Sequence, residues 1–307
     1  MNNETPLTRL AQCAYETIVP NRIRKGLHNR AWLRNRARWD GIRGTSKSLV
    51  RSLGGGVRLN LYGDSKLCEM LYFDQFEPET RCFLDAYLRS GDVFLDIGAN
   101  VGLYTIAAAR IVGVGGEVHA FEPCAQTFSR LEENVRLNGL RGVSCHRLAL
   151  SDSNAEAQLS IAKDGFDAWN SLGKPYMGEP GGHETVQTVT LDSFVSHHRL
   201  DGRITAMKID VEGWENQVLA GAERLLSAPN APALCVEFTE EAAQLAGSSC
   251  AALYQTLERL GFQMFTVGDT PESVVPFAKC DPFPNVNLLA LKDPAGSRAR
   301  LRQSLSR

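Results

Sequence analysis

Short apolar runs alternate with helical patterns along most of the chain, and this rhythm predicts a parallel α/β sheet. The apolar runs predict five strands, at residues 92–97, 117–121, 143–150, 204–211 and 233–238. Between them apolar residues recur at helical spacing, as in "LYTIAAARIV", which ends at Gly113. Two last runs, "FQMFTV" and "NVNLLALK", are close enough to form an antiparallel pair at the edge of the sheet.

The rhythm breaks between the third and fourth predicted strands. Residues 157–191 have two alternating, strand-like ends around a middle rich in Gly and Pro. Such a pattern is typical of an inserted hairpin or flap, which we assign to residues 163–184. A helix is predicted after the fourth strand, over residues 214–226.

The first 60 residues differ from the rest and form a basic, helical N-terminal extension. The run "NRIRKGLHNRAWLRNRARWDGIRGTSK" is dense in Arg, with Trp32 and Trp39 between the charges. The preferred interpretation is a solvated helix that packs both tryptophans on the main domain; the alternative is a binding face for an anionic glycan or a membrane surface. Residues 61–295 would then form the main domain, and residues 296–307 a polar tail.

Composition narrows the class of protein. The chain has 307 residues, 43% of them hydrophobic, and a formal net charge of -2, so nothing attracts it globally to nucleic acid. It has no apolar run of about 18 residues, and its start lacks the order of a secretory signal. The eight cysteines form no CxxC pair, which favours reduced thiols and a cytoplasmic protein. The sequence does not indicate an oligomeric state.

A glycine loop follows the first predicted strand, in "DIGANVG". A pyrophosphate-binding loop has glycine at the middle of G-x-G-x-x-G, but Asn100 occupies that position here, between Gly98 and Gly102. Its side chain would crowd a pyrophosphate. Glu122, at the end of the second strand, is the acid expected about 20 positions on, and could accept hydrogen bonds from ribose hydroxyls. The loop therefore predicts a nucleoside ligand without phosphate, such as S-adenosylmethionine; the alternative is a simple strand-to-helix turn.

Two acids end apolar strands. Asp96 is costly to bury unless it is paired, and at its strand's end it could organise loop amides or water near the ligand. In "KIDVEGWE", alternation should place Lys208 and Asp210 on the face opposite Met207 and Ile209. Asp210 lies at the carboxyl end of its strand, where open α/β sheets bind ligands, so it is a candidate site residue.

The chain resembles the FkbM-type S-adenosylmethionine-dependent methyltransferases. The shared segments are "FLDIGANVGLYTIAAAR", "GEVHAFEPCAQTFSRLEENVRLNG", "LALSD", "VTLDSFV" and "MKIDVEGWENQVLAGAERLL". They cover roughly residues 70 to 240, with looser agreement to residue 292. The pairing of "DIGANxG" with a downstream "KIDVEGxE" is specific. The resemblance implies a class I, Rossmann-like fold with a seven-stranded, mostly parallel sheet and an antiparallel last strand.

The resemblance also implies a cofactor site. Its residues would be Asp96, Gly98, Asn100, Gly102, Glu122, Ser151 and Asp152. In this set, Gly98, Asn100 and Gly102 shape the loop and Glu122 binds the ribose diol. Ser151 or Asp152 could bond the adenine amino group, because this fold usually holds the adenine after the third strand; the alternative is an ordinary turn.

The implied activity is methyl transfer to a hydroxyl, most readily one of a saccharide or glycosylated metabolite. A carboxylate or histidine that takes the hydroxyl proton should help. Candidates are Asp210, Glu212, Glu237 and His183, the last in the flap beside the presumed acceptor pocket. Magnesium held by the three carboxylates is not favoured, because they have no dedicated metal spacing.

The flap supplies groups that suit a sugar ring, namely Phe166, Trp169, Asn170 and Tyr176. They would line an acceptor pocket together with Glu237 at the rim, or else form a hydrophobic plug at the sheet edge. Two other functions remain open. A nicotinamide-dependent oxidoreductase is disfavoured by Asn100 and the missing third glycine, and a non-catalytic module by the intact acids.

Overall fold

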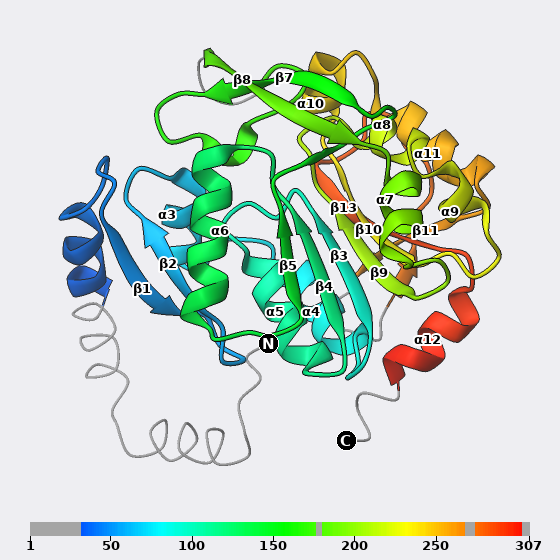
Figure 1. Ribbon diagram of the computed structural model, residues 1–307, viewed down its shortest axis with the longest axis horizontal. Coiled ribbons are helices and arrows are strands. Elements are labelled where there is room, and N and C mark those ends of the chain that lie inside the picture. Colours follow the sequence, from blue (N-terminus) through cyan, green and yellow to red (C-terminus); the bar gives the residue numbers. More distant parts are fainter. Residues whose placement is uncertain (1–31, 176–179, 268–273, 303–307) are drawn as a thin grey trace.

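The computed structural model describes residues 32–175, 180–267 and 274–302, and its centre is a twisted eight-stranded sheet (Figure 1). In spatial order the strands are β12 (Val274–Pro276), β11 (Gln263–Val267), β13 (Val286–Leu291), β10 (Ala233–Phe238), β9 (Ile204–Ile209), β3 (Val93–Ile97), β4 (Glu117–Phe121) and β5 (Val143–His146). The predicted α/β class is confirmed. β13 runs antiparallel to both β10 and β11, as the two last apolar runs predicted. The short β12 adds an eighth strand to the expected seven.

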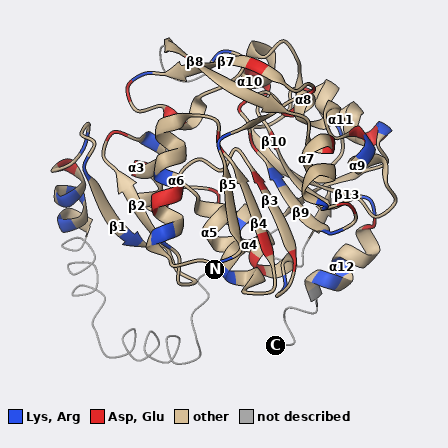
Figure 2. Cartoon of the chain, viewed as in Figure 1, with Lys and Arg blue, Asp and Glu red and all other residues tan. Residues whose placement is uncertain are grey.

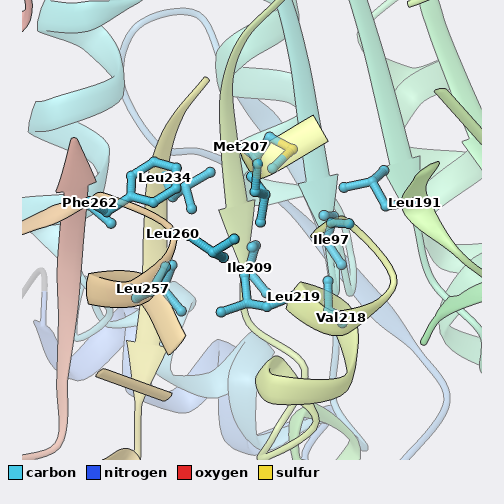
Figure 3. Close-up of a cluster of buried hydrophobic side chains, with 14 of the residues drawn as sticks. Ile97, Leu191, Met207, Ile209, Val218, Leu219, Leu234, Leu257, Leu260 and Phe262 are labelled. Carbon is cyan, nitrogen blue, oxygen red and sulfur yellow. The ribbon is translucent and has the colours of Figure 1, made fainter. Parts of the chain in front are cut away.

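Helices cover both faces of the sheet. One face packs against α4 (Pro78–Tyr87), α5 (Leu103–Val112) and α6 (Ala125–Leu137). The other packs against α7 (Leu191–His198), α8 (Glu215–Ala220), α9 (Glu223–Ser227) and α11 (Cys250–Arg259). On this second face Met207 and Ile209 of β9 meet Val218 and Leu219 of α8 (Figure 3). The predicted alternation is therefore confirmed, and Lys208 lies on the α5 side.

The N-terminal segment is built into the main body. A helix over residues 32–40 with several basic residues leads to the hairpin of β1 (Ser48–Ser52) and β2 (Arg58–Tyr62) and to α3 (Lys66–Tyr72) (Figure 2). Trp39 is fully buried, 5.0 Å from the ring of Tyr72, whereas Trp32 is 52% exposed, so the expected packing is wrong for Trp32. The expected boundary at residue 60 falls inside β2. Residues 1–31 lie outside the described residues, and membrane contact there stays a prediction.

The third predicted strand divides into two. β5 ends at His146, and β6 (Ala149–Leu150) joins a separate sheet with β7 (Ala155–Ala162) and β8 (Pro180–Val189). β7 and β8 pair antiparallel and lie over the carboxyl end of the central sheet (Figure 1). The segment between them carries a 3₁₀ turn, η1 (Asp167–Trp169). The inserted hairpin is thus present, and its strands begin before residue 163 and end after residue 184.

One predicted helix and the predicted polar tail differ in the structure. The helix expected over residues 214–226 breaks at Gly221, where a Cβ atom would lie 1.9 Å from the carbonyl oxygen of Ser151. The polar tail folds through residue 302 as α12 (Pro294–Arg302), because the Arg300 side chain donates to the Tyr87 carbonyl (2.7 Å) and pairs with Asp92. No helix in the described ranges is long and apolar enough to cross a bilayer.

Candidate active site

A cavity of about 320 Å³ lies at the carboxyl ends of β3, β4 and β9, with the η1 segment in its wall. Among the residues that line it are Gly98, Asn100, Glu122, Trp169, Asn170, Asp210, Glu212 and Glu237. The structure therefore gathers most of the residues predicted for cofactor, acceptor and proton transfer into one space. Carboxyl ends of parallel strands are the usual ligand-binding edge of such sheets.

The glycine loop is shaped by contacts that exclude side chains. Gly98 has φ +83°, and a Cβ atom there would lie 1.7 Å from the carbonyl oxygen of Asp210. The loop after β3 consequently touches the loop after β9. Asn100 also adopts a left-handed conformation, at φ +47°, with its side-chain oxygen accepting from the amide of Val101 at 2.7 Å. Gly102 caps α5 at φ +93° and does not line the cavity.

Glu122 ties the glycine loop to the end of β4. Its buried carboxylate accepts hydrogen bonds from the amides of Asn100 (3.1 Å) and Cys124 (2.9 Å). Burial raises the pKa of Glu122 to about 8, against which these two hydrogen bonds act. The carboxyl group has lone pairs left for ligand hydroxyls, because each oxygen can accept more than one hydrogen bond.

Besides Gly102, three of the predicted cofactor residues do not line the cavity. Asp96 is buried and accepts from the Thr105 hydroxyl of α5 at 2.5 Å, and its role near the ligand stays a prediction. Ser151 accepts from the indole nitrogen of Trp214 at 3.0 Å, and its hydroxyl donates to Asp152 at 3.2 Å. Neither Ser151 nor Asp152 lines the cavity, and an adenine contact from them stays a prediction.

The position expected for His183 is corrected by the alternation of β8. Val186 and Thr188 are buried along this strand, whereas His183, Thr185 and Gln187 are exposed on its other face. His183 pairs with Ser160 of β7 and is absent from the cavity wall. The histidine therefore does not lie beside the pocket as proposed from the sequence.

Three acidic residues form a cluster in the cavity wall, at the carboxyl ends of β9 and β10. Carboxylate oxygens of Asp210, Glu212 and Glu237 all lie within 4.8 Å of one another. The buried ammonium of Lys208 pairs with Asp210 and sits 4.8 Å from the ring centre of Tyr104. Burial lowers the pKa of Lys208, but the carboxylates of Asp210, Glu77 and Asp96 outweigh it and raise that pKa above its ordinary value. The lysine stays charged and balances one of the carboxylates.

The other two acids in the cluster lack such a partner. Burial, followed by the charge of Asp210, raises the pKa values of Glu212 and Glu237 well above the ordinary range. One buried oxygen of each finds no hydrogen-bond partner in the part of the chain that the structure describes. Glu215 instead accepts from the amides of Val211 and Gly213 and holds the turn, as expected for an acid at a helix start. Oxygens this close could hold a divalent cation.

Two contributors were not predicted from the sequence. Glu77, at the start of α4, accepts from the Tyr104 hydroxyl at 2.7 Å, and both residues line the cavity. Tyr104 lies in the shared segment after the first strand, but its partner is 27 positions away, and the packing of α4 on α5 brings the two together. Lys208 could have been found, since alternation already placed it on the same face as Asp210.

The flap is tied to the cluster and to α6. The Ser171 hydroxyl donates to the backbone carbonyl of Glu212 at 2.7 Å. Asn170 accepts from the amide of Ala162 at 2.9 Å, which fixes its side chain in the cavity wall. Arg130 of α6 pairs with Asp167 of η1 at 3.5 Å. Tyr176, proposed for the acceptor pocket, lies outside the described residues.

The charge of the cavity wall favours a cationic nucleoside over one that carries a pyrophosphate. Carboxylates line it at Glu77, Glu122, Asp167, Asp210, Glu212 and Glu237. Lys208 is the only basic residue among the described lining residues, and it is already paired. A pyrophosphate would keep these acids from ionising, whereas the sulfonium and ammonium charges of S-adenosylmethionine would favour their ionised forms. Apolar side chains such as Phe121 and Leu150 offer faces for an adenine ring.

This sheet, with a cavity at the carboxyl ends of its strands, is the class I, Rossmann-like fold of methyltransferases. The model of one family, described as the methyltransferase FkbM domain, matches residues 96–264. The chain belongs to this FkbM methyltransferase family, as its sequence motifs predicted.

Several known proteins are similar over part of the chain. The 31-O-demethyl-FK506 methyltransferase FkbM of Streptomyces tacrolimicus is 30% identical over 182 residues, which cover 50% of this chain and 68% of that protein. The hexuronic acid methyltransferase AglP of Haloferax volcanii is 32% identical over 143 residues, 45% of this chain and 53% of that protein. The crystal structure of a methyltransferase FkbM from Methylobacillus flagellatus KT aligns with a TM-score of 0.42 and 16% identity, over 73% of this chain and 54% of that one.

Proposed function

We propose that the protein transfers a methyl group from S-adenosylmethionine to a hydroxyl of a saccharide or glycosylated metabolite. The observation that carries this proposal is the acidic cluster at the end of β9 and β10, in the same cavity as the glycine loop and Glu122. Trp169 and Asn170 add an aromatic face and an amide to the wall, groups that suit a sugar ring. Two similar proteins are named for O-methylation and for a hexuronic acid, which supports this acceptor class.

Each residue of the cluster has its own role in removing the proton of the acceptor hydroxyl. When bound, S-adenosylmethionine supplies a methyl group whose S–C bond breaks as the new O–C bond forms. Asp210 accepts the proton that the acceptor hydroxyl loses, and Lys208 fixes the orientation of that carboxylate. Glu212 and Glu237 hydrogen-bond the hydroxyl through the oxygens that lack a partner in the described chain and hold it in line.

Cofactor affinity is expected to depend on pH through Glu122. Its pKa of about 8 means that the carboxyl group of the free protein is largely neutral at pH 6. Two ribose hydroxyls donate better to the ionised form, so binding releases a proton and the Kd for S-adenosylhomocysteine should fall as pH rises from 6 to 8. Titration calorimetry at these two pH values measures the change.

The variant Glu122→Gln provides the control, because it keeps the size of the side chain and removes its ionisation. We expect about tenfold weaker binding at pH 8 and a flat pH dependence. An unchanged Kd at both pH values would show that Glu122 does not bind the ribose. Asp201→Asn, at an exposed carboxylate paired with Arg224, should bind like the unaltered chain.

Magnesium is expected to be dispensable, although the three carboxylates could hold it. Lys208 already supplies a fixed positive charge to the cluster. Turnover should therefore persist after EDTA treatment, measured as methyl transfer from labelled S-adenosylmethionine. Loss of turnover that magnesium alone restores would instead assign Asp210, Glu212 and Glu237 as metal ligands.

A further inference from the structure

A second cavity, of about 500 Å³, adjoins the first on the side away from the glycine loop. Glu77 and Glu237 line both cavities, so these two residues stand between them, and Glu237 joins the second cavity to the acidic cluster. The walls of the second cavity come from the start of α4, the carboxyl ends of β10 and β11 and the start of β13. The remaining lining residues are Glu79, Thr80, Cys235, Thr239, Thr266, Val267, Asn285, Val286 and Asn287.

Two neighbouring side chains in this wall have oxygen atoms without a donor. Glu237 of β10 and Asn287 of β13 are paired residues in the antiparallel register, so their side chains share one face of the sheet. One oxygen of Glu237 accepts from the Thr239 hydroxyl at 3.1 Å. Its other oxygen and the amide oxygen of Asn287 are buried without a hydrogen-bond partner in the described residues. Buried polar atoms are nearly always bonded, so this pair calls for a ligand with hydroxyl groups, which can donate to Asn287 and either donate to Glu237 or accept from its protonated form.

The charge of the second cavity restricts the ligand further. Its wall carries three carboxylates, Glu77, Glu79 and Glu237, and no Lys, Arg or His among the described lining residues. A carboxylate or phosphate on the ligand would meet repulsion from Glu77 and Glu79 with no compensating cation among the described lining residues. Hydroxyl and amide groups at Thr80, Thr239 and Asn287 match a neutral ligand with several hydroxyls.

We propose that this second cavity is the acceptor subsite and that it takes a neutral polyhydroxylated ring. Adjacent ring hydroxyls bond to Glu237 and Asn287, and the hydroxyl to be methylated reaches past Glu77 and Glu237 into the first cavity, which Asp210 lines. This subsite rests on the proposed methyl transfer and narrows its acceptor. It separates the chain from the similar hexuronic acid methyltransferase, because a uronate is anionic.

Saturation-transfer NMR on the full chain, saturated with S-adenosylhomocysteine, tests the subsite. The probes are methyl β-D-glucopyranoside and methyl β-D-glucuronide, which differ in the charge at one carbon. We expect saturation transfer to the neutral glucoside and none to the glucuronide. Asn287→Leu should weaken glucoside binding about tenfold without changing the affinity for S-adenosylhomocysteine. Asn287→Ala replaces it if the leucine variant does not fold, and the exposed Asn230→Leu is the matched control.

Three results would contradict the proposed acceptor subsite. These are an absence of glucoside binding, equal binding of the glucuronide, and glucoside binding that neither Asn287 variant weakens. Each of these results is compatible with the proposed methyl transfer as long as S-adenosylhomocysteine binds. Failure of S-adenosylhomocysteine itself to bind would count against the proposed function, so the two failures are distinguishable.

Discussion

Replacing Asp210 with asparagine is expected to lower kcat by about a hundredfold to ten thousandfold, the range found when a positioned proton acceptor is lost. The amide keeps the shape of the side chain but cannot take the hydroxyl proton, and it loses the ionic partner of Lys208. Single-turnover methyl transfer from labelled S-adenosylmethionine measures the effect directly.

Two controls separate chemistry from folding in that variant. The affinity for S-adenosylhomocysteine should change by less than about threefold, because Asp210→Asn adds no bulk to the cavity. Asp201→Asn, at an exposed carboxylate, should keep full turnover. Full turnover in Asp210→Asn would remove this residue from the proton transfer and leave Glu212 or Glu237 to carry it.

Replacing Lys208 with methionine is expected to destabilise the fold by about 3–5 kcal/mol, the usual effect of removing one partner from a buried ion pair. Lys208 is 1% exposed, and without its ammonium group Asp210 is left among Glu212, Glu237 and Asp96 with no cation nearby. Urea unfolding at neutral pH measures the free energy of unfolding.

The double variant Lys208→Met with Asp210→Asn checks the cause. It removes both charges, so it should recover much of the lost free energy of unfolding. If Lys208→Met lowers the free energy of unfolding by less than about 1 kcal/mol, the Lys208–Asp210 pair behaves like a solvated ion pair and not like a buried one.

The central strands could be predicted because they are buried on both faces and are mostly apolar, with isolated polar residues such as Asp96, His119 and Lys208. β4 and β10 begin and end where the sequence predicted. The run at residues 143–150 was predicted as one strand although the polar His146 and Arg147 interrupt it, and β6 after them pairs with β8 of another sheet. Helix α8 ends early because the backbone at Gly221 approaches Ser151, a contact between segments distant in the sequence.

The candidate site was predictable where one motif supplies the residue. Gly98, Asn100, Glu122 and Asp210 follow strands directly, so their position at the sheet edge comes with the fold. The pairs across elements were not predictable, because they depend on the register and crossing of segments. The Glu77–Tyr104 hydrogen bond and the Glu237–Asn287 pair are of this kind. His183 was misplaced because its face depends on a one-residue choice of register in β8.

We propose that the cavity is a site for a cationic nucleoside, since its wall is acidic and its loop has Asn100 where a pyrophosphate needs glycine. Titration calorimetry of the full chain with S-adenosylhomocysteine, and separately with NAD, tests this claim most directly. Saturable binding of S-adenosylhomocysteine at one site per chain, with no binding of NAD at the same concentrations, is the predicted result. Binding of NAD without binding of S-adenosylhomocysteine would contradict it and favour a nicotinamide-dependent oxidoreductase.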